Sequence, residues 1–111
     1  MLVMTDSRDT IERYFVLAAD PDLRAYFAQF ADDVVVEDEG HLYHGIDAIR
    51  GWRTSVPPVT YDVRSVEPVD GGHRALALIS GDFPGSPVTL AFAFTLEGGR
   101  IRTLTIRPAD G

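Results

Sequence analysis

The stretch FADDVVVEDEGHLYHGIDAIRGWR, residues 30–53, decides the fold of this chain. Its apolar and turn-forming residues predict, in order, the end of a helix, a strand over 34–38, a hairpin turn at Glu39-Gly40, a short return strand over 41–44 and a helix from 45 to about 54. The stretch therefore predicts a hairpin that runs directly into a helix.

The acidic run at the end of the first strand is the most informative part of this stretch. Successive side chains of a strand point to opposite faces, so Asp38 shares a face with Val34 and Val36. If the two valines face the interior, Asp38 follows them inward. A carboxylate in an apolar interior is costly unless it is paired, and acid–base chemistry often occurs at such positions. The alternative is that Asp38 is a solvated acid at the end of a strand.

The residues before the stretch predict two helices. Ile11, Tyr14, Phe15 and Ala18 recur at helical spacing and give an amphipathic first helix that ends near Asp20. Pro21 suits the first position of a second, short helix. The apolar face of that helix is expected to carry Leu23, Tyr26, Phe27 and Phe30.

The residues after the stretch predict strands. Alternating or apolar runs bounded by turn residues cover 59–63, 74–82, 88–96 and 100–107. Short sequential strands of this kind pair antiparallel. The expected fold is α+β, a single domain over 1–111 in which three helices, placed before the long strands, pack on one face of a mostly antiparallel sheet.

Composition limits the possible partners and chemistry. The chain has 111 residues, a net charge of −7 and no cysteine. An acidic chain is a poor match for nucleic acid or an anionic membrane surface, and thiol or cysteine–zinc chemistry is excluded. No membrane span or signal peptide is recognisable in the sequence, so a cytoplasmic location is expected.

Three motifs carry a family resemblance. IERYF at 11–15, FADDVVVEDEG at 30–40 and GIDAIRGW at 45–52 are similar to motifs of the nuclear transport factor 2-like superfamily. Within it, the whole chain resembles the SnoaL-like and ketosteroid isomerase-like small proteins. The resemblance implies a curved sheet wrapped by helices into a cone, an apolar pocket inside the cone, and a homodimer formed through the outer face of the sheet.

The resemblance also implies roles for individual residues. It places a catalytic base at Asp38, a hydrogen-bond donor to an oxyanion at Tyr14 and a pocket aromatic at Trp52. The second acid of the ketosteroid isomerase oxyanion hole is expected on the third long strand, where this chain carries Phe92. The full isomerase pattern is therefore incomplete.

Other residues are candidates for the wall of the pocket. Phe92 and Phe94 share one face of a strand, and His44 is a candidate to pair with Asp38 or to orient a ligand. The predicted ligand-binding set is Phe15, Phe30, Val36, His44, Trp52, Phe92 and Phe94. Packing in the core is the simpler role for Tyr14 and for the aromatic residues of this set.

No metal or cofactor is expected. His41 and His44 form an H-x-x-H pair, but positions three apart on a strand face opposite sides and do not reach one ion. The sequence carries no glycine-rich phosphate loop.

Two classes of function follow. The first is cofactor-free proton transfer on a small apolar carbonyl compound, as in an isomerase, cyclase or dehydratase. The second is a non-catalytic pocket that binds a ligand or serves as a dimeric scaffold. Besides these two classes, a protein–protein adaptor is a third, without an obvious partner-binding tail in the sequence to support it. The geometry of Asp38 and Tyr14 distinguishes these classes, because the enzyme requires both groups in one open pocket.

Overall fold

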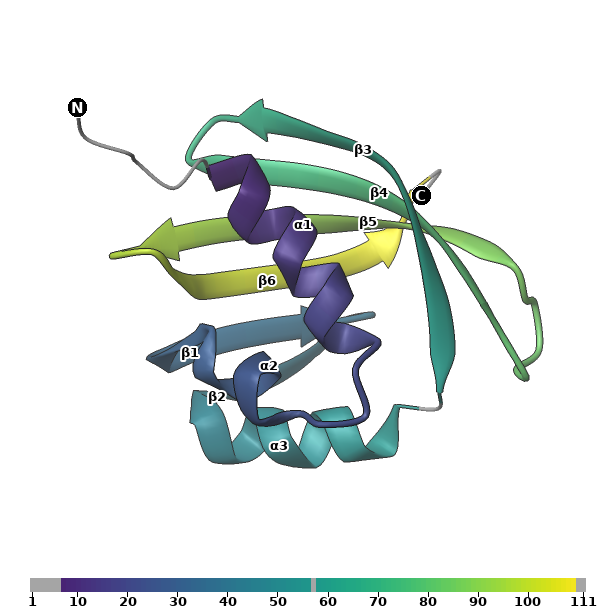
Figure 1. The fold of residues 1–111 in the computed structure, drawn as a ribbon, viewed down its shortest axis with the longest axis horizontal. Helices are drawn as coiled ribbons and strands as arrows, with labels where there is room; N and C mark the ends of the chain where they lie inside the picture. Colours follow the sequence, from purple (N-terminus) through teal and green to yellow (C-terminus); the bar gives the residue numbers. More distant parts are fainter. Residues whose placement is uncertain (1–6, 57, 110–111) are drawn as a thin grey trace.

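The computed structural model describes residues 7–56 and 58–109 (Figure 1). Along the chain it contains α1 (Ser7–Ala18), α2 (Arg24–Ala28), β1 (Phe30–Asp38), β2 (His41–His44), α3 (Gly45–Ser55), β3 (Val59–Val69), β4 (Gly72–Gly81), β5 (Val88–Glu97) and β6 (Arg100–Pro108). The fold is α+β, as predicted, and α3 lies between the β1–β2 hairpin and the long strand β3, where the sequence predicts a helix over 45–54.

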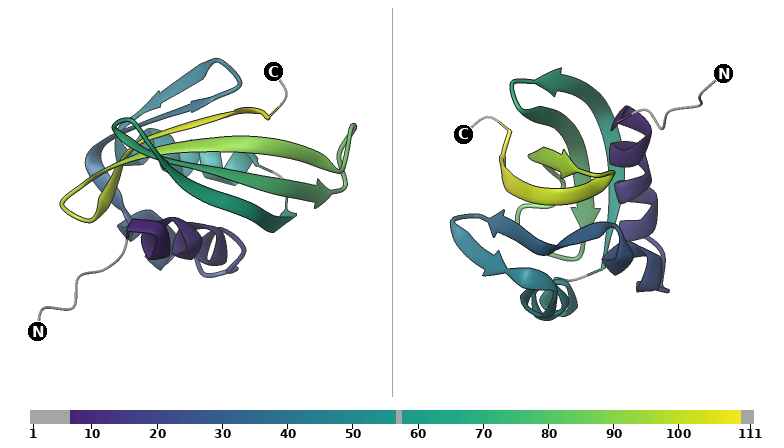
Figure 2. Two further views of the ribbon diagram at one scale, coloured as in Figure 1. Left: turned by 90° about the horizontal axis from the view of Figure 1, so that it is seen from above. Right: turned by 90° about the vertical axis from the view of Figure 1, so that its left-hand side faces the viewer.

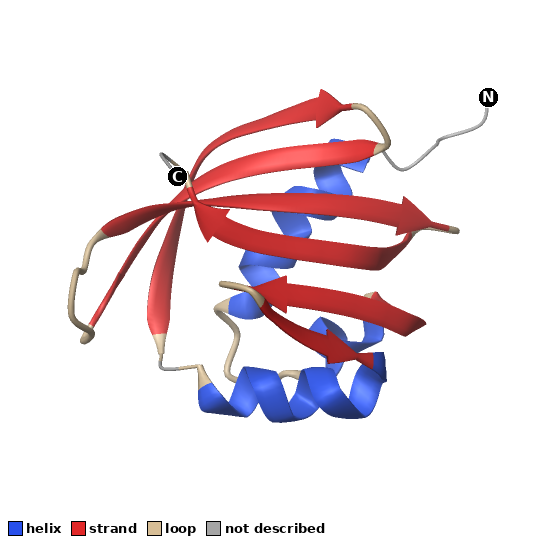
Figure 3. Ribbon diagram, turned by 180° about the vertical axis from the view of Figure 1, so that it is seen from behind, coloured by secondary structure: helices blue, strands red, loops and turns tan. Residues whose placement is uncertain are grey.

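The six described strands form one sheet with the order β2-β1-β6-β5-β4-β3. Neighbouring strands pair antiparallel except β1 and β6, which are parallel, with Val36 opposite Leu104. Figure 3 shows β6 in the middle of the sheet, between the N-terminal hairpin and the three long strands. The parallel pair was not predicted, because the expectation of antiparallel pairing considered only strands that follow one another in the chain.

The helices cover one face and one edge of the sheet. Helix α1 crosses the inner face and contacts β3 and β4, whereas α3 packs against β1 and β2 (Figure 1). Figure 2 shows how strongly β3, β4 and β5 bend round α1. Because of this curvature, the start of β3 lies near the C-terminal end of α3 (Figure 1). The helices therefore enclose the concave side of the sheet.

The core lies between α1 and the concave face of the sheet. Its fully or almost fully buried side chains come from every layer and include Ile11, Tyr14, Phe15, Tyr26, Val34, Val36, Ile49, Phe92, Phe94, Ile101 and Leu104. The aromatic rings meet mainly edge to face, as between Tyr14 and Phe94 at 5.2 Å, which is a favourable arrangement for such rings. The apolar face predicted for the first helix is confirmed.

The β1–β2 turn has the predicted length and position. Glu39 and Gly40 have φ angles of 51° and 86°, the pair of positive values that a two-residue hairpin turn requires. Asp38 and His41 are the partners that flank the turn. Gly45 has φ 83°, and this conformation lets the chain leave β2 and enter α3 without a connecting loop.

The second helix is shorter than predicted. It begins at Arg24, not at Pro21, because the Asp20 and Asp22 carboxylates accept hydrogen bonds from the backbone N–H groups of Asp22 and Arg24. Such local bonds compete with helix formation. Phe30 does not belong to this helix, and it begins β1 opposite Ile101 of β6.

None of the helices in the described ranges is long and apolar enough to cross a membrane.

Candidate functional site

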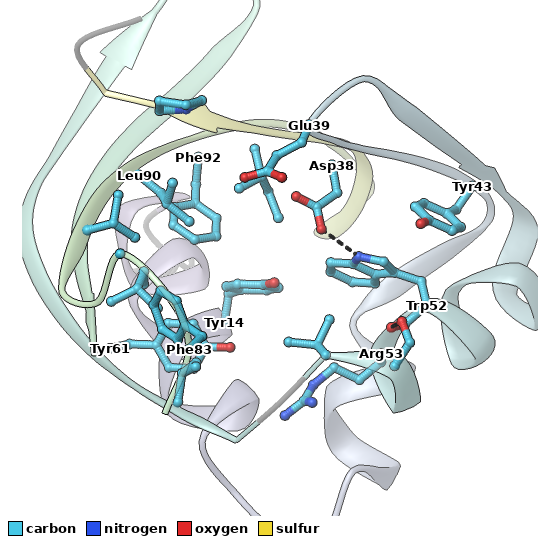
Figure 4. Close-up of a pocket in the computed structure, with 18 of the residues that line it drawn as sticks. Tyr14, Asp38, Glu39, Tyr43, Trp52, Arg53, Tyr61, Phe83, Leu90 and Phe92 are labelled. Atoms are coloured by element: carbon cyan, nitrogen blue, oxygen red, sulfur yellow. Dashed lines mark hydrogen bonds between the residues drawn. The ribbon is translucent and has the colours of Figure 1, made fainter. Parts of the chain in front are cut away.

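A cavity of about 530 Å³ opens between α1, α3 and the bent ends of β3, β4 and β5 (Figure 4). Most of the side chains that line it are apolar or aromatic, among them Trp52, Val56, Val59, Ile79, Phe83, Val88, Leu90, Phe92 and Ile106. Its polar groups come from Tyr14, Tyr26, Asp38, Glu39, Tyr43, Arg53, Ser55 and Tyr61. An apolar cavity with a few convergent polar groups is the usual form of a small-molecule site.

Asp38 is the last residue of β1, and its side chain lines this cavity. Val34 and Val36 on the same face are completely buried, and Asp38 follows them inward as strand alternation predicts. The Trp52 indole Nε1 donates a hydrogen bond of 3.0 Å to Asp38 Oδ2 (Figure 4). Within the described part of the chain, the other oxygen, Oδ1, accepts no hydrogen bond from the protein.

The acids beside Asp38 have different surroundings. Glu37 points to the opposite face of the sheet, where Arg107 binds its carboxylate at 2.8 Å. Glu39 lies on the turn and also borders the cavity, but it is exposed. The acidic run is therefore not one solvated cluster, because its central residue faces the interior.

The Tyr14 and Tyr26 hydroxyls form a buried pair in the cavity wall, 3.2 Å apart. A pair of hydroxyls joined by one hydrogen bond uses one of its two protons, so one proton remains to be donated to a ligand. Burial raises the pKa of Tyr14 well above its usual value and raises that of Tyr26 as well, and the positive charge of Arg53 acts in the opposite direction on both. Both phenols are therefore protonated at neutral pH.

Two further polar residues of the wall lie close to this pair. Burial also raises the pKa of Tyr61, which extends from β3, and again the Arg53 charge lowers it. Arg53 is held in place by a hydrogen bond of 2.8 Å from its Nη2 to the Ala18 carbonyl oxygen. Its guanidinium also lies over the Tyr26 ring, 5.5 Å from the centroid.

The structure brings four of the predicted site residues together. Asp38, Tyr14, Trp52 and Phe92 all line the cavity. Phe92 occupies the position predicted for a second oxyanion-hole acid, and its ring lies 6.3 Å from that of Tyr14. The Tyr26 hydroxyl lies 3.2 Å from that of Tyr14, and Tyr61 and Arg53 are near enough to affect the pKa of Tyr14.

Five residues of the predicted ligand-binding set do not line the cavity, and the set is corrected accordingly. Phe15, Phe30, Val36 and Phe94 lie behind its wall, in the core. Phe94 shares a strand face with Phe92, but the Tyr14 ring packs on it. His44 is exposed, because it pairs with Val35 and so belongs to the face of the hairpin opposite Asp38.

Several residues of the wall were not predicted from the sequence, and Arg53, Tyr26 and Tyr61 are the ones that matter most for chemistry. Tyr61 alternates with polar neighbours, which indicates an inward position but not a cavity. Arg53 follows Trp52 directly, and two consecutive helical residues are separated by about 100° around the axis. Nothing in the local pattern indicates that both reach the same cavity.

No group of three or more His, Asp or Glu side chains within 7–56 and 58–109 is arranged to hold a metal ion.

A family model described as the SnoaL-like domain matches residues 11–104. The chain belongs to the SnoaL-like domain family. This SnoaL-like chain is also similar to a solved structure of a proposed polyketide cyclase from Sinorhizobium meliloti, with 34% sequence identity and a TM-score of 0.84. That similarity covers 93% of this chain and 100% of the other.

More distant structures share the fold of this SnoaL-like chain. A protein of Catenulispora acidiphila with a ketosteroid isomerase-like fold, solved with trimethylamine, has 17% identity and a TM-score of 0.76 over 89% of this chain and 84% of its own. A proposed SnoaL-like polyketide cyclase from Jannaschia sp. CCS1 has 15% identity and a TM-score of 0.77 over 98% and 92%. No curated protein shows significant similarity to the chain. The chain therefore shares its fold with a proposed polyketide cyclase and with a protein described as having a ketosteroid isomerase-like fold.

Proposed function

We propose that this SnoaL-like protein is a cofactor-free enzyme that moves a proton next to the carbonyl group of a small, mostly apolar molecule. One observation carries the proposal: a half-buried carboxylate, Asp38, and a buried pair of tyrosine hydroxyls, Tyr14 and Tyr26, line the same apolar cavity. A base and a neutral hydrogen-bond donor are the two groups that enolisation requires.

Asp38 serves as the base. The Trp52 indole holds Oδ2 and fixes the orientation of the carboxylate, so Oδ1 is the oxygen that abstracts the proton from the carbon next to the carbonyl. The same carboxyl group returns the proton to another carbon or oxygen of the substrate. Return of the proton to another carbon gives isomerisation. If the enolate carbon first attacks a second carbonyl of the same molecule, return of the proton to the new alkoxide completes cyclisation, and if a hydroxyl on the neighbouring carbon takes the proton and leaves as water, the result is dehydration.

Tyr14 stabilises the enolate oxygen. The raised pKa keeps its phenol protonated. Either hydroxyl of the pair can donate to the other, and in the arrangement in which Tyr26 donates to the Tyr14 oxygen, the Tyr14 proton is left for the substrate. One such donor is worth about 10² to 10³ in kcat. Phe92 stands where the second oxyanion-hole acid was expected. The tyrosine pair and the nearby Tyr61 supply hydrogen-bond donors in place of that acid.

The size of the cavity suits a molecule of a few fused rings, since pockets for drug-sized ligands measure roughly 300–1,000 Å³. The similarity to a proposed polyketide cyclase favours a polyketide-like or steroid-like skeleton.

The test is hydrogen exchange of the substrate carbon in D₂O. Steroid enones and aromatic ketones are incubated with the wild-type protein, and deuterium incorporation next to the carbonyl is followed by mass spectrometry. The enzyme is expected to accelerate exchange of the ketones that quench Trp52 fluorescence. Ketones that bind without exchange would contradict proton transfer and favour the alternative function, a non-catalytic ligand-binding module.

We propose in addition that the protein is a homodimer formed through the outer face of its sheet. If the protein is not an enzyme, the corresponding alternative function is that of a dimeric scaffold. Small residues such as Ala91 and Ala93 lie on that face beside Leu76 and Leu78, and the two leucines are only half-buried in one copy of the chain. A face of this composition suits close packing against a second sheet.

Light scattering is expected to give twice the 12.2 kDa mass of one chain for the wild type. Ala93→Arg should give the single mass, whereas Val16→Arg, at a 70% exposed position on α1, should remain dimeric. A monomeric wild type would refute the dimer.

A further inference from the structure

Arg53 gives the cavity a positive charge that the proposed proton transfer does not use. Among the described residues that line the cavity, it is the only cation, and the charged groups beside it in the lining are the acids Asp38 and Glu39. Figure 4 shows the Arg53 guanidinium on the side of the cavity opposite the Asp38 carboxylate. The cavity therefore has an acidic side and a cationic side.

The protein does not neutralise this charge. The partners of the guanidinium are the Ala18 carbonyl oxygen and the face of the Tyr26 ring, and neither carries a full negative charge. Across residues 7–56 and 58–109, no carboxylate forms an ion pair with Arg53. A half-buried charge is normally paired, because its removal from water is costly.

The hydrogen-bonding capacity of Arg53 is also incompletely used. Its Nε is buried without an acceptor in the described part of the chain, and its Nη2 bond to Ala18 occupies one of five N–H donors. An arginine whose role was only to hold the end of α1 would need no more than that bond. Nε has almost no accessible surface, so the donors that remain for a ligand are those of the two terminal nitrogens. These donors and the uncompensated charge call for an acceptor from outside the protein.

The surroundings of Arg53 are suited to an oxyanion. The neutral hydroxyls of Tyr14, Tyr26 and Tyr61 lie close enough for its charge to lower the pKa that burial raises. Phenol O–H groups and a guanidinium together bind a carboxylate through charge-assisted hydrogen bonds. Because the whole chain carries a net charge of −7, its overall field repels anions, and an anion that binds must do so through a specific site.

We propose that the Arg53 side of the cavity binds an anionic group of the ligand, such as a carboxylate. The ligand is then an apolar carbonyl compound with an acidic group at one end, and its reactive carbon lies towards Asp38. The position of the reactive carbon rests on the proposed function. The anion subsite itself depends only on an open cavity.

Two fluorescent probes with one skeleton test the subsite. The anionic probe is 1-anilinonaphthalene-8-sulfonate, and N-phenyl-1-naphthylamine lacks the sulfonate. The wild type is expected to bind the anionic probe more tightly. In Arg53→Gln, its Kd should rise about 10- to 100-fold, the range for a lost charged hydrogen bond, whereas the Kd of the neutral probe should change little. A near-ultraviolet circular dichroism spectrum equal to that of the wild type shows that the variant is folded.

Two variants control for charge and for the helix. Arg53→Lys keeps a positive charge and should retain part of the preference for the anion. Arg50→Gln lies on the same helix, outside the cavity lining and over the Phe27 ring, and should behave as the wild type. An unchanged preference in Arg53→Gln, with the neutral probe still bound, would overturn the anion subsite and leave the proposed function intact. Failure of both probes to bind the wild type would overturn the open ligand cavity, and the proposed function with it.

Discussion

Replacing Asp38 with Asn is expected to reduce enzyme-accelerated hydrogen exchange of a bound ketone by about 10² to 10⁴, the usual contribution of a general base. The amide is nearly identical in shape to the carboxylate, and its oxygen can still accept the hydrogen bond from Trp52 Nε1. The cavity should therefore keep its form and its affinity for the ketone while it loses the group that takes the proton. The measurement is the rate of deuterium incorporation at saturating ketone, together with Kd from Trp52 fluorescence.

Glu37→Gln is the matched control for Asp38→Asn. It removes a carboxylate one residue away, but Glu37 lies on the other face of the sheet and binds Arg107. Its exchange rate should equal that of the wild type. If Asp38→Asn also exchanged at the wild-type rate, Asp38 would not be the base, and Glu39, the other acid of the cavity lining, would be the next candidate.

The free energy of unfolding is expected to fall steeply as the pH rises above about 10. Burial raises the pKa of Tyr14, Tyr26 and Tyr61 in the folded state, whereas an unfolded tyrosine ionises near pH 10. Above that pH, the folded protein binds more protons than the unfolded chain, so stability decreases with pH. Their contribution to stability is complete below pH 10 and is lost as the pH rises towards the folded pKa values.

The expected slope of this loss is large. Each tyrosine that stays protonated only in the folded state contributes about 1.4 kcal/mol per pH unit, so three such groups give a slope of about 3 to 4 kcal/mol per pH unit. The sequence contains no lysine or cysteine, so tyrosines are the side chains that titrate between pH 10 and 12. Urea unfolding at intervals from pH 9 to 11.5 measures the slope.

Tyr26→Phe provides the control for the alkaline titration. It removes one of the three groups and should lower the slope by about a third, whatever it does to stability at pH 8. A free energy of unfolding that stayed constant to pH 11.5 in the wild type would show that these hydroxyls ionise as readily in the folded state as in the unfolded chain.

The inward position of Asp38 could be predicted because it depends on local geometry. A strand alternates with a period of two, and a two-residue turn at Glu39 and Gly40 fixes which residues of the return strand lie opposite. The same geometry, applied one step further, excludes His44 from the cavity. His44 pairs with Val35, whose side chain lies on the face of the hairpin opposite Asp38. His44 therefore does not reach the cavity, contrary to the prediction.

The outline of the cavity could not be predicted, because it depends on contacts between distant segments. Phe92 and Phe94 lie on the same face of β5, so the strand pattern does not distinguish them. The path of α1 across the sheet places the Tyr14 ring on Phe94 and leaves Phe92 in the wall of the cavity. Arg53 reaches the cavity because the curved strands approach the end of α3. The parallel β1–β6 pair joins segments about 70 residues apart, as Val36 and Leu104 show, and no local pattern encodes it.

The position of β6 in the sheet has a consequence for the order in which the chain folds during synthesis. The ribosome makes β1 and β2 early and β6 after every other described strand, yet β6 lies between β1 and β5. Until β6 emerges, the hairpin and the β3–β5 meander have no strand to join them, and each leaves an unpaired edge. Such edges favour aggregation. Nascent chains halted before residue 100 should therefore depend on chaperones, and the cavity should form only in the final step of folding.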